Sequence, residues 1–197
     1  MTQAPQRPLI LGSTSAYRRE LLSRLRLPFS VVGPEVDETP LQDERPQQLA
    51  CRLAMAKARA VAALHPQAVV IGSDQVADLN GLPLGKPGDH ARATVQLQQM
   101  RGKTVIFQTA VAVVCQDSGF AQMDLAQVKV RFRDLSNEEI ERYLLAETPY
   151  DCAGSAKSEG LGIALLDAIE SDDPTALVGL PLIRTCTMLR AVGVQVL

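Results

Sequence analysis

The chain has 197 residues, of which 46% are hydrophobic and 21% charged, so it is long enough to enclose a sizeable core. Twenty basic residues against 22 acidic ones give a net charge of −2. Sequence-independent binding to long DNA or RNA is disfavoured because it requires a basic excess, and any anion site must therefore be local. No stretch approaches the roughly 18 apolar residues of a membrane span, and the N-terminal apolar run is too short for a secretory signal.

The cysteines give information about the compartment. Cys51, Cys115, Cys152 and Cys186 lie far apart and form no CxxC pair. This spacing fits reduced thiols better than a disulfide framework or a zinc site. We therefore expect a soluble cytoplasmic protein, with no nucleic-acid polymer and no membrane among its partners.

The first half of the chain alternates short apolar runs with amphipathic stretches. In chain order, we expect a strand at 9–12, a helix capped by Ser13-Thr14-Ser15, a strand at 29–32, a helix at 47–64 and a strand at 68–76. Asn80-Gly81 follows as a strong signal for a hairpin turn.

The pattern of the second half begins with a helix and a hairpin. In chain order, we expect a helix at 89–101, hairpin strands at 103–115 and 123–133, a helix at 136–147, a Gly-rich loop at 151–162, a helix at 181–191 and a terminal strand. Strands and helices alternate early, whereas a hairpin occupies the middle. This order predicts an α/β fold with a mixed sheet in a single domain, residues 1–197.

Two adjacent arginines, Arg18 and Arg19, lie in the first turn of the first expected helix. Cations are disfavoured at this positive end of a helix unless they share an anion with it. The hydroxyls of Ser13 and Ser15 would complete a phosphate cradle. The alternative is a pair of solvated arginines on an exposed face, and spacing alone does not separate the two interpretations.

Lys57 and Asp74 are the next candidates. Lys57 lies on the apolar stripe of the long helix, where a lysine either extends to the rim or reaches a buried anion. Asp74 follows Val-Val-Ile-Gly-Ser near the end of a central strand, where ligand clefts of α/β sheets open. A carboxylate there can hold a divalent metal or accept a proton from water, but it can also simply stabilise a turn.

The remaining charged candidates lie in loops. Glu35, Asp37 and Glu38 form an acidic cluster that becomes a metal candidate if the fold brings it opposite Asp74. Lys86 lies between Gly85 and Pro87 and is weak evidence alone. His65 and His90 have no partners at ligand spacing, so we expect surface positions and no histidine base.

Taken together, these segments resemble the Maf family of nucleoside triphosphate pyrophosphatases, in the family's order and over nearly the whole chain. The segments that carry the resemblance are Leu11–Leu22, Glu35–Glu38, Ala54–Ala58, Gly72–Gln75, Gly85–Pro87 and Asp151–Gly162. The resemblance implies an elongated mixed sheet with flanking helices, in two lobes around a nucleotide cleft. One departure is Ala16, where the family's first motif usually has proline, and this removes no chemical group.

The resemblance also implies roles for individual residues. It makes Asp74 the proton acceptor and gives Glu38 a metal-side role, so Glu38 and Asp74 are the expected ligands of a divalent cation, Mg²⁺ or Mn²⁺. It gives phosphate-binding roles to Ser13, Arg18, Lys57 and Lys86, to which the pattern of the first helix start adds Ser15 and Arg19. Those expected to select the substrate are Tyr17, Gln75 and Glu159.

Within the family, the chain is most similar to the branch that acts on 7-methyl-GTP. The base of that nucleotide is cationic, so it favours an aromatic face, here Tyr17, and a carboxylate, here Glu159. Core packing of Tyr17 and a surface position for Glu159 are the alternatives. The branch that acts on dTTP and UTP typically has Arg and Gln at these positions.

Three other functions stay open at this point. They are hydrolysis of dTTP, UTP or other modified nucleotides, nucleotide binding without catalysis by a regulator of septum formation, and nucleotidyl transfer to a second substrate. Turnover with water alone would separate hydrolysis from the last two. The sequence does not establish the oligomeric state, and a homodimer stays open.

Overall fold

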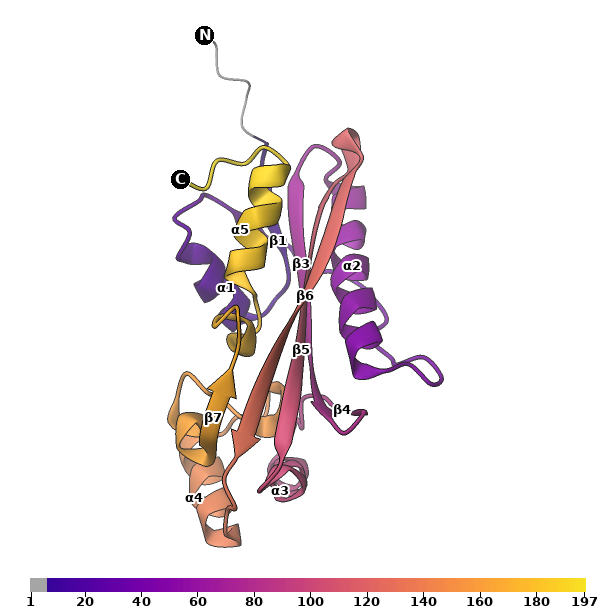
Figure 1. The fold of residues 1–197 in the computed structure, drawn as a ribbon. Helices are drawn as coiled ribbons and strands as arrows, with labels where there is room; N and C mark the ends of the chain where they lie inside the picture. Colours follow the sequence, from indigo (N-terminus) through magenta and orange to yellow (C-terminus); the bar gives the residue numbers. More distant parts are fainter. Residues whose placement is uncertain (1–6) are drawn as a thin grey trace.

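The computed structural model describes residues 7–197 and shows a long, twisted mixed sheet flanked by helices (Figure 1). The strands are β1 (Leu9–Gly12), β2 (Ser30–Val31), β3 (Val69–Leu79), β4 (Leu82–Leu84), β5 (Thr104–Cys115), β6 (Phe120–Phe132) and β7 (Leu166–Glu170). Their order is β2-β1-β3-β5-β6-β7, with β4 paired to β3. β1 runs parallel to β2 and β3, whereas the pairs from β3 to β7 are antiparallel. The predicted mixed α/β fold is confirmed.

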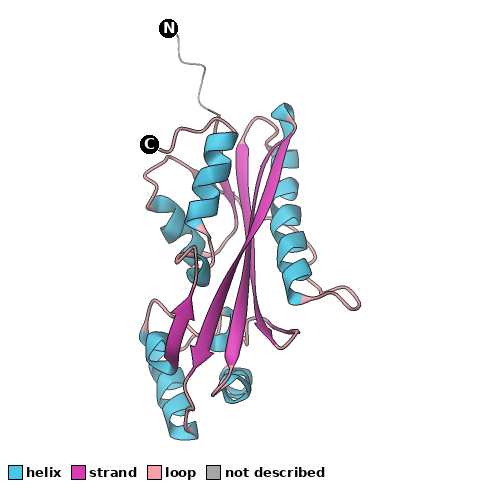
Figure 2. Ribbon diagram, viewed as in Figure 1, coloured by secondary structure: helices cyan, strands magenta, loops and turns pink. Residues whose placement is uncertain are grey.

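Within residues 7–197, five α-helices flank this sheet, and Figure 2 shows them around it. They are α1 (Ala16–Ser23), α2 (Pro46–Leu64), α3 (His90–Met100), α4 (Asn137–Glu147) and α5 (Leu182–Ala191). In the upper half of Figure 1, α2 lies along one face of the sheet and α1 and α5 lie on the other, while α3 and α4 lie at the lower end. None of the helices in the described part of the chain is long and apolar enough to span a membrane.

The core divides into an upper and a lower lobe that share the central strands, and in the upper lobe α2 packs a further cluster onto the opposite face of the sheet. In the upper lobe, Ile71 of β3 and Val111 of β5 pack with α1 and α5. In the lower lobe, Ala77 of β3 and Phe107 of β5 pack with α3 and α4. Because each strand enters both clusters, burying apolar surface in either lobe also fixes the strands that cross between them.

Gly72 allows α2 to lie unusually close to β3. A Cβ atom at this position would be 2.6 Å from the backbone nitrogen of Ala58, so any side chain would force the helix away from the strand. This close approach sets the distance between Lys57 on α2 and Asp74 on β3.

The Asn80-Gly81 turn forms as predicted. Asn80 has φ of +55° and Gly81 has φ of +88°, and the turn joins β3 to β4. Two consecutive residues with positive φ match the twist of a tight hairpin. The second predicted strand, in contrast, shrinks to Ser30–Val31.

The predicted terminal strand is wrong. Gly193, with φ of +91°, turns the chain after α5, and the N–H of Val194 donates to the carbonyl of Leu189 at 2.8 Å. The donor is thus satisfied at the helix end, and the Val194 side chain packs into the upper core. A short strand that was not predicted, β7, pairs with β6 at the edge of the sheet.

Candidate active site

A cavity of about 660 Å³ opens where the two lobes meet, and segments distant in sequence line it. All but one of the predicted site residues contribute to its wall. They are Ser13, Ser15, Tyr17, Arg18, Glu38, Lys57, Asp74, Gln75, Lys86 and Glu159. The tertiary structure therefore brings together residues up to 146 positions apart, from Ser13 to Glu159.

The turn between β1 and α1 forms one wall. Ser13 is buried, and its hydroxyl accepts a hydrogen bond from the backbone N–H of Ser15 at 3.2 Å. Ser15 is the N-cap of α1, and its hydroxyl accepts from the N–H of Arg18 at 3.4 Å. The cap leaves the helix N-terminus, with its partial positive charge, directed at the cavity edge.

Arg18 holds its guanidinium inside this wall. Nε donates to the carbonyl of Gly179 at 2.8 Å, and a terminal nitrogen donates to the hydroxyl of Ser13 at 3.4 Å. Burial lowers the pKa of Arg18, and the carboxylates of Asp74 and Glu38 oppose this shift. A guanidinium remains charged in proteins, so the cavity has a fixed cation with further N–H donors for an anion.

Arg19 is the exception among the predicted residues. It is exposed and does not line the cavity. Successive residues of a helix point about 100° apart, so only one of two neighbouring arginines can face the cleft. The structure places Arg18 in the cavity wall and Arg19 outside it, which does not match the expectation that both arginines face one anion.

Lys57 lies between two carboxylates. Its Nζ is 2.7 Å from Oδ1 of Asp74 and 2.6 Å from Oε1 of Glu38. Lys57 is only 5% exposed and Asp74 only 7%, so the lysine reaches one buried anion, Asp74, and also meets the exposed carboxylate of Glu38. Burial favours a raised pKa for Glu38, but Lys57, Lys86 and Arg18 outweigh it, and the pKa is lowered.

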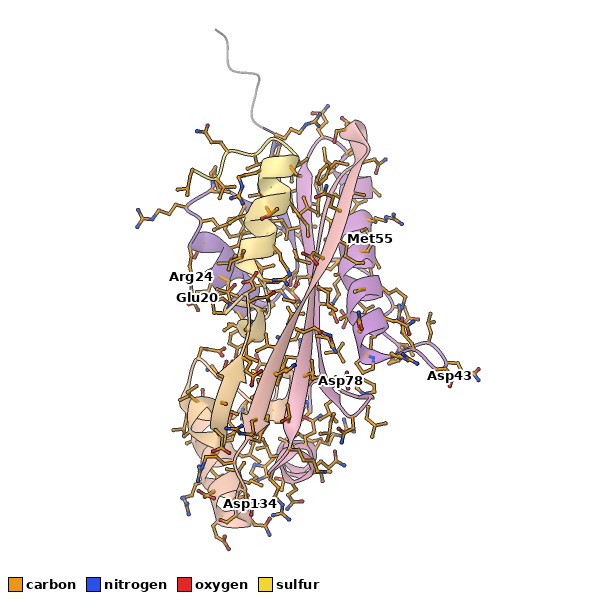
Figure 3. The ribbon with its side chains drawn as sticks, in the orientation of Figure 1. Glu20, Arg24, Asp43, Met55, Asp78 and Asp134 are labelled. Atoms are coloured by element: carbon orange, nitrogen blue, oxygen red, sulfur yellow. The ribbon has the colours of Figure 1, made fainter. Side chains whose placement is uncertain are left out.

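The loop that carries Glu38 is anchored by a residue that the sequence analysis missed. Arg52 of α2 donates to both carboxylate oxygens of Glu44, at 2.6 and 2.8 Å, and to the carbonyl of Thr39 at 3.0 Å. Figure 3 shows Asp43 at the outer tip of this loop, beyond the lower end of α2. Arg52 and Glu44 are eight residues apart, which is not the spacing of a local helical pair, so no local pattern indicated this contact.

The acidic loop supplies one carboxylate to the cavity instead of three. Glu35 and Asp37 do not line it, and Asp37 accepts a hydrogen bond from the N–H of Thr39 at 2.9 Å. Within residues 7–197, no group of three His, Cys, Asp or Glu side chains is placed to hold a metal. The pair of Glu38 and Asp74 still fits Mg²⁺, which typically takes one or two carboxylates together with substrate phosphates and water.

The wall around Tyr17 has a different chemical character. The hydroxyl of Tyr17 donates to Oδ1 of Asp151 at 3.4 Å and lies 3.7 Å from Sγ of Cys152. Burial raises the pKa of Tyr17 and raises that of the Cys152 thiol to about 12, so both groups are protonated near neutral pH. Glu159 is an exposed part of the same wall. Roles for Asp151 and Cys152 were missed, although both lie in a segment that carries the family resemblance.

Gln75 is fixed by its amide nitrogen. Nε2 lies 3.0 Å from Oγ1 of Thr109, 2.9 Å from the carbonyl of Ala176 and 3.0 Å from that of Leu177. These contacts engage the donor side of the amide with the protein. The carbonyl oxygen is therefore the part of Gln75 that can accept a hydrogen bond from a ligand.

Neither histidine is part of the cavity wall. His90 contacts the hydroxyl of Tyr150 at 3.0 Å and the carboxylate of Glu141 at 2.9 Å, and His65 is exposed. Asp74 and Glu38 are thus the carboxylates next to the cationic group, and Asp74 is the more buried of the two.

Residues 8–192 match the family model described as Maf-like protein. The chain belongs to the Maf family. A 7-methyl-GTP pyrophosphatase of Albidiferax ferrireducens is 75% identical over 197 residues, which cover 100% of this chain and 99% of the relative. One from Polaromonas sp. is 74% identical over 188 residues, covering 95% and 86%. The solved Ham1 protein of Staphylococcus aureus aligns with 64% of this chain and 72% of its own, at a TM-score of 0.48 and 17% identity, too weak for any argument.

Proposed function

We propose that this chain hydrolyses 7-methyl-GTP to 7-methyl-GMP and pyrophosphate. The observation that carries the proposal is the separation of charge within one cavity. Three cations, Arg18, Lys57 and Lys86, gather around Glu38 and Asp74, whereas the wall around Tyr17 carries carboxylates. The substrate has the complementary layout, since its triphosphate is anionic and its methylated base is cationic. The names of the relatives at 75% and 74% identity support the same substrate.

The wall around Tyr17 suits the methylated base. A cation over the Tyr17 ring gains roughly 0.5–2 kcal/mol, depending on how far it is desolvated. Glu159 can accept the N1–H and the exocyclic amine hydrogens of guanine, and Asp151 adds a second negative charge beside the ring. An unmethylated base makes the same hydrogen bonds but lacks the charge, so this wall favours the methylated form.

Asp74 is the proposed general base. The hydrogen bond from Lys57 goes to Oδ1, so Oδ2 can accept a proton from water. That water attacks the α-phosphorus, the bond to the bridging oxygen breaks, and the electron pair leaves with pyrophosphate. Lys57 has three N–H donors, of which two meet Asp74 and Glu38, and the third can contact a phosphate. Arg18 and Lys86 neutralise charge that builds up on the leaving group.

A divalent cation, Mg²⁺ or Mn²⁺, is part of the proposal. Glu38 and Asp74 would hold it together with phosphate oxygens, because their carboxylates already converge on one cationic group, Nζ of Lys57. When bound, such an ion neutralises phosphate charge and makes the α-phosphorus easier to attack.

The test is a panel of triphosphates assayed with the metal and scored by pyrophosphate release. The panel contains 7-methyl-GTP, GTP, dTTP and UTP, each also assayed with EDTA. We expect the highest kcat/KM for 7-methyl-GTP and no turnover with EDTA. Equal rates on methylated and unmethylated GTP contradict the substrate, preference for dTTP or UTP places the chain with the other branch, and binding without turnover supports a regulator.

We further propose that residues 1–197 act as one domain and that the protein works in the cytoplasm. The sharing of β3 and β5 between two core clusters supports the first point. The four cysteines are free thiols, which supports a reducing compartment.

A further inference from the structure

Glu147, the last residue of α4, makes two short contacts that the proposed reaction does not use. Its Oε1 is 2.8 Å from Nζ of Lys157, and its Oε2 accepts a hydrogen bond from the backbone N–H of Leu161 at 2.7 Å. The carboxyl side chain is largely buried. Glu147 lies outside the cavity wall, so it does not meet a ligand there directly.

The two partners of Glu147, Lys157 and Leu161, lie on either side of Glu159 in the sequence. Between them the chain makes a tight turn, in which the N–H groups of Gly160 and Gly162 both donate to the carbonyl of Lys157, at 3.1 and 3.0 Å. A Cβ atom at Gly160 would lie 2.7 Å from Oε2 of Glu147. The turn is therefore wound closely against this carboxylate, and its shape sets where Glu159 stands.

The same ion pair acts on Tyr17. Nζ of Lys157 lies 5.9 Å from the centroid of the Tyr17 ring, within the range of a cation–π contact. An uncompensated ammonium there would repel a cationic base. Glu147 places a negative charge 2.8 Å from that ammonium and so reduces the repulsion.

We propose that Glu147 is a positioning residue for base selection, which holds Glu159 beside Tyr17 and balances the charge of Lys157 without touching the substrate. This proposal rests on the proposed function, since it needs a cationic base. It predicts an effect on the choice between methylated and unmethylated GTP, whereas a merely structural role predicts an effect on stability alone.

The first experiment compares Glu147→Gln with Glu139→Gln. Glu139 is a matched control on the same helix, because its carboxylate also takes one basic side chain, Arg133, and one backbone N–H, that of Ser136. For each variant, kcat and KM are measured for 7-methyl-GTP and GTP, with a thermal melt. We expect Glu147→Gln to lower the preference for 7-methyl-GTP about fivefold or more, mainly through KM, and Glu139→Gln to leave it unchanged.

The second experiment tests whether Glu147 acts through Glu159. In a Glu159→Gln background, Glu147→Gln is expected to lose less preference than it does alone, because the positioning part of its effect is gone and only the uncompensated charge of Lys157 beside Tyr17 remains. Gly160→Ala provides an independent perturbation, since it displaces the Glu147 carboxylate without removing it. It also serves if Glu147→Gln fails to fold.

Three outcomes would overturn the proposal. They are full preference in a folded Glu147→Gln or Gly160→Ala protein, an equal loss in Glu139→Gln, and additive effects in the double variant. If the unmutated protein shows no preference for the methylated base, the proposed function itself fails, and this proposal falls with it. The unmutated protein thus separates failure of the function from failure of the positioning role.

Discussion

The two ends of the cavity are built in different ways. Around Asp74 the buried groups Asp74 and Lys57 lie on β3 and α2, and Arg18 lies at the start of α1, while Glu38 and Lys86 join from loops. Nζ of Lys57 meets Asp74 at 2.7 Å and Glu38 at 2.6 Å. Around Tyr17, Asp151 and Glu159 come from the connection between α4 and β7 and are exposed. The hydroxyl of Tyr17 meets its partners at 3.4 and 3.7 Å.

This difference follows the demands of each task. Proton abstraction and stabilisation of a leaving group require fixed geometry, which packed strands and helices provide. Base selection requires a charge and an aromatic surface, which a loop can present on a rigid scaffold. A loop can therefore change the base that is selected while the phosphate end keeps its chemistry.

The largest effect is expected from Asp74→Asn. The variant keeps the size of the side chain but removes the base, so kcat for 7-methyl-GTP should fall on the order of 10²-fold or more. The melting curve should still show a single folded species. Single-turnover pyrophosphate release measures the effect, and near wild-type turnover would move the role of base to Glu38.

Arg18→Ala tests the cation of the phosphate end. Loss of its charge-assisted hydrogen bonds should lower kcat/KM, with a loss of about 1.5–3 kcal/mol of transition-state stabilisation. The loss should be the same for every triphosphate in the panel. The matched control is Arg19→Ala, which removes the neighbouring exposed arginine and should leave kcat/KM unchanged. An equal loss in both variants would restore a shared phosphate role for the two arginines.

Glu159→Gln tests the loop end, where the choice of substrate should change and the chemistry should not. The neutral amide is nearly isosteric, so the variant should lose about 1–2 kcal/mol of preference for 7-methyl-GTP over GTP. Turnover of GTP should stay close to that of the unmutated protein. A uniform loss on both substrates would place Glu159 in the chemical step.

Two substitutions of Tyr17 separate the contribution of its ring from that of its hydroxyl. Tyr17→Ala removes the aromatic face and should cost about 0.5–2 kcal/mol of preference for the methylated base. Tyr17→Phe retains the face and loses the long contacts of the hydroxyl with Asp151 and Cys152, so most of the preference should remain. The measurement is the ratio of kcat/KM for 7-methyl-GTP to kcat/KM for GTP in each variant. Equal losses of this preference in both variants would assign the effect to the hydroxyl.

The smallest effect concerns stability against pH. The hydrogen bonds from Lys157 and from the N–H of Leu161 lower the pKa of Glu147. A carboxylate with a lowered folded pKa stabilises the fold fully above its ordinary value of about 4.3 and loses this contribution as the pH falls through the folded pKa. The difference in Tm between wild type and Glu147→Gln should thus be largest near neutral pH and disappear in acid. It corresponds to less than about 1 kcal/mol in the free energy of unfolding. A difference in Tm that does not change with pH would contradict an ionised Glu147.

The sequence by itself determined most of the regular elements. The long helix at 46–64, the central hairpin of β5 and β6 and the Asn80-Gly81 turn all follow from local periodicity and turn chemistry. The pattern also offered a buried contact for Lys57 and an anion site at the start of the first helix, each as one of two open interpretations. The edge strand β7 carried too weak a local signal, because its five residues include two acids and lie mostly exposed.

Only the tertiary structure decided which charged residues meet. Helix geometry selected Arg18 over Arg19, and the close approach of α2 at Gly72 placed Lys57 between Glu38 and Asp74. The contacts of Arg52 and Glu147 were also invisible in the sequence. Each joins a charged side chain to a loop whose position depends on packing, and local residue patterns do not encode that position.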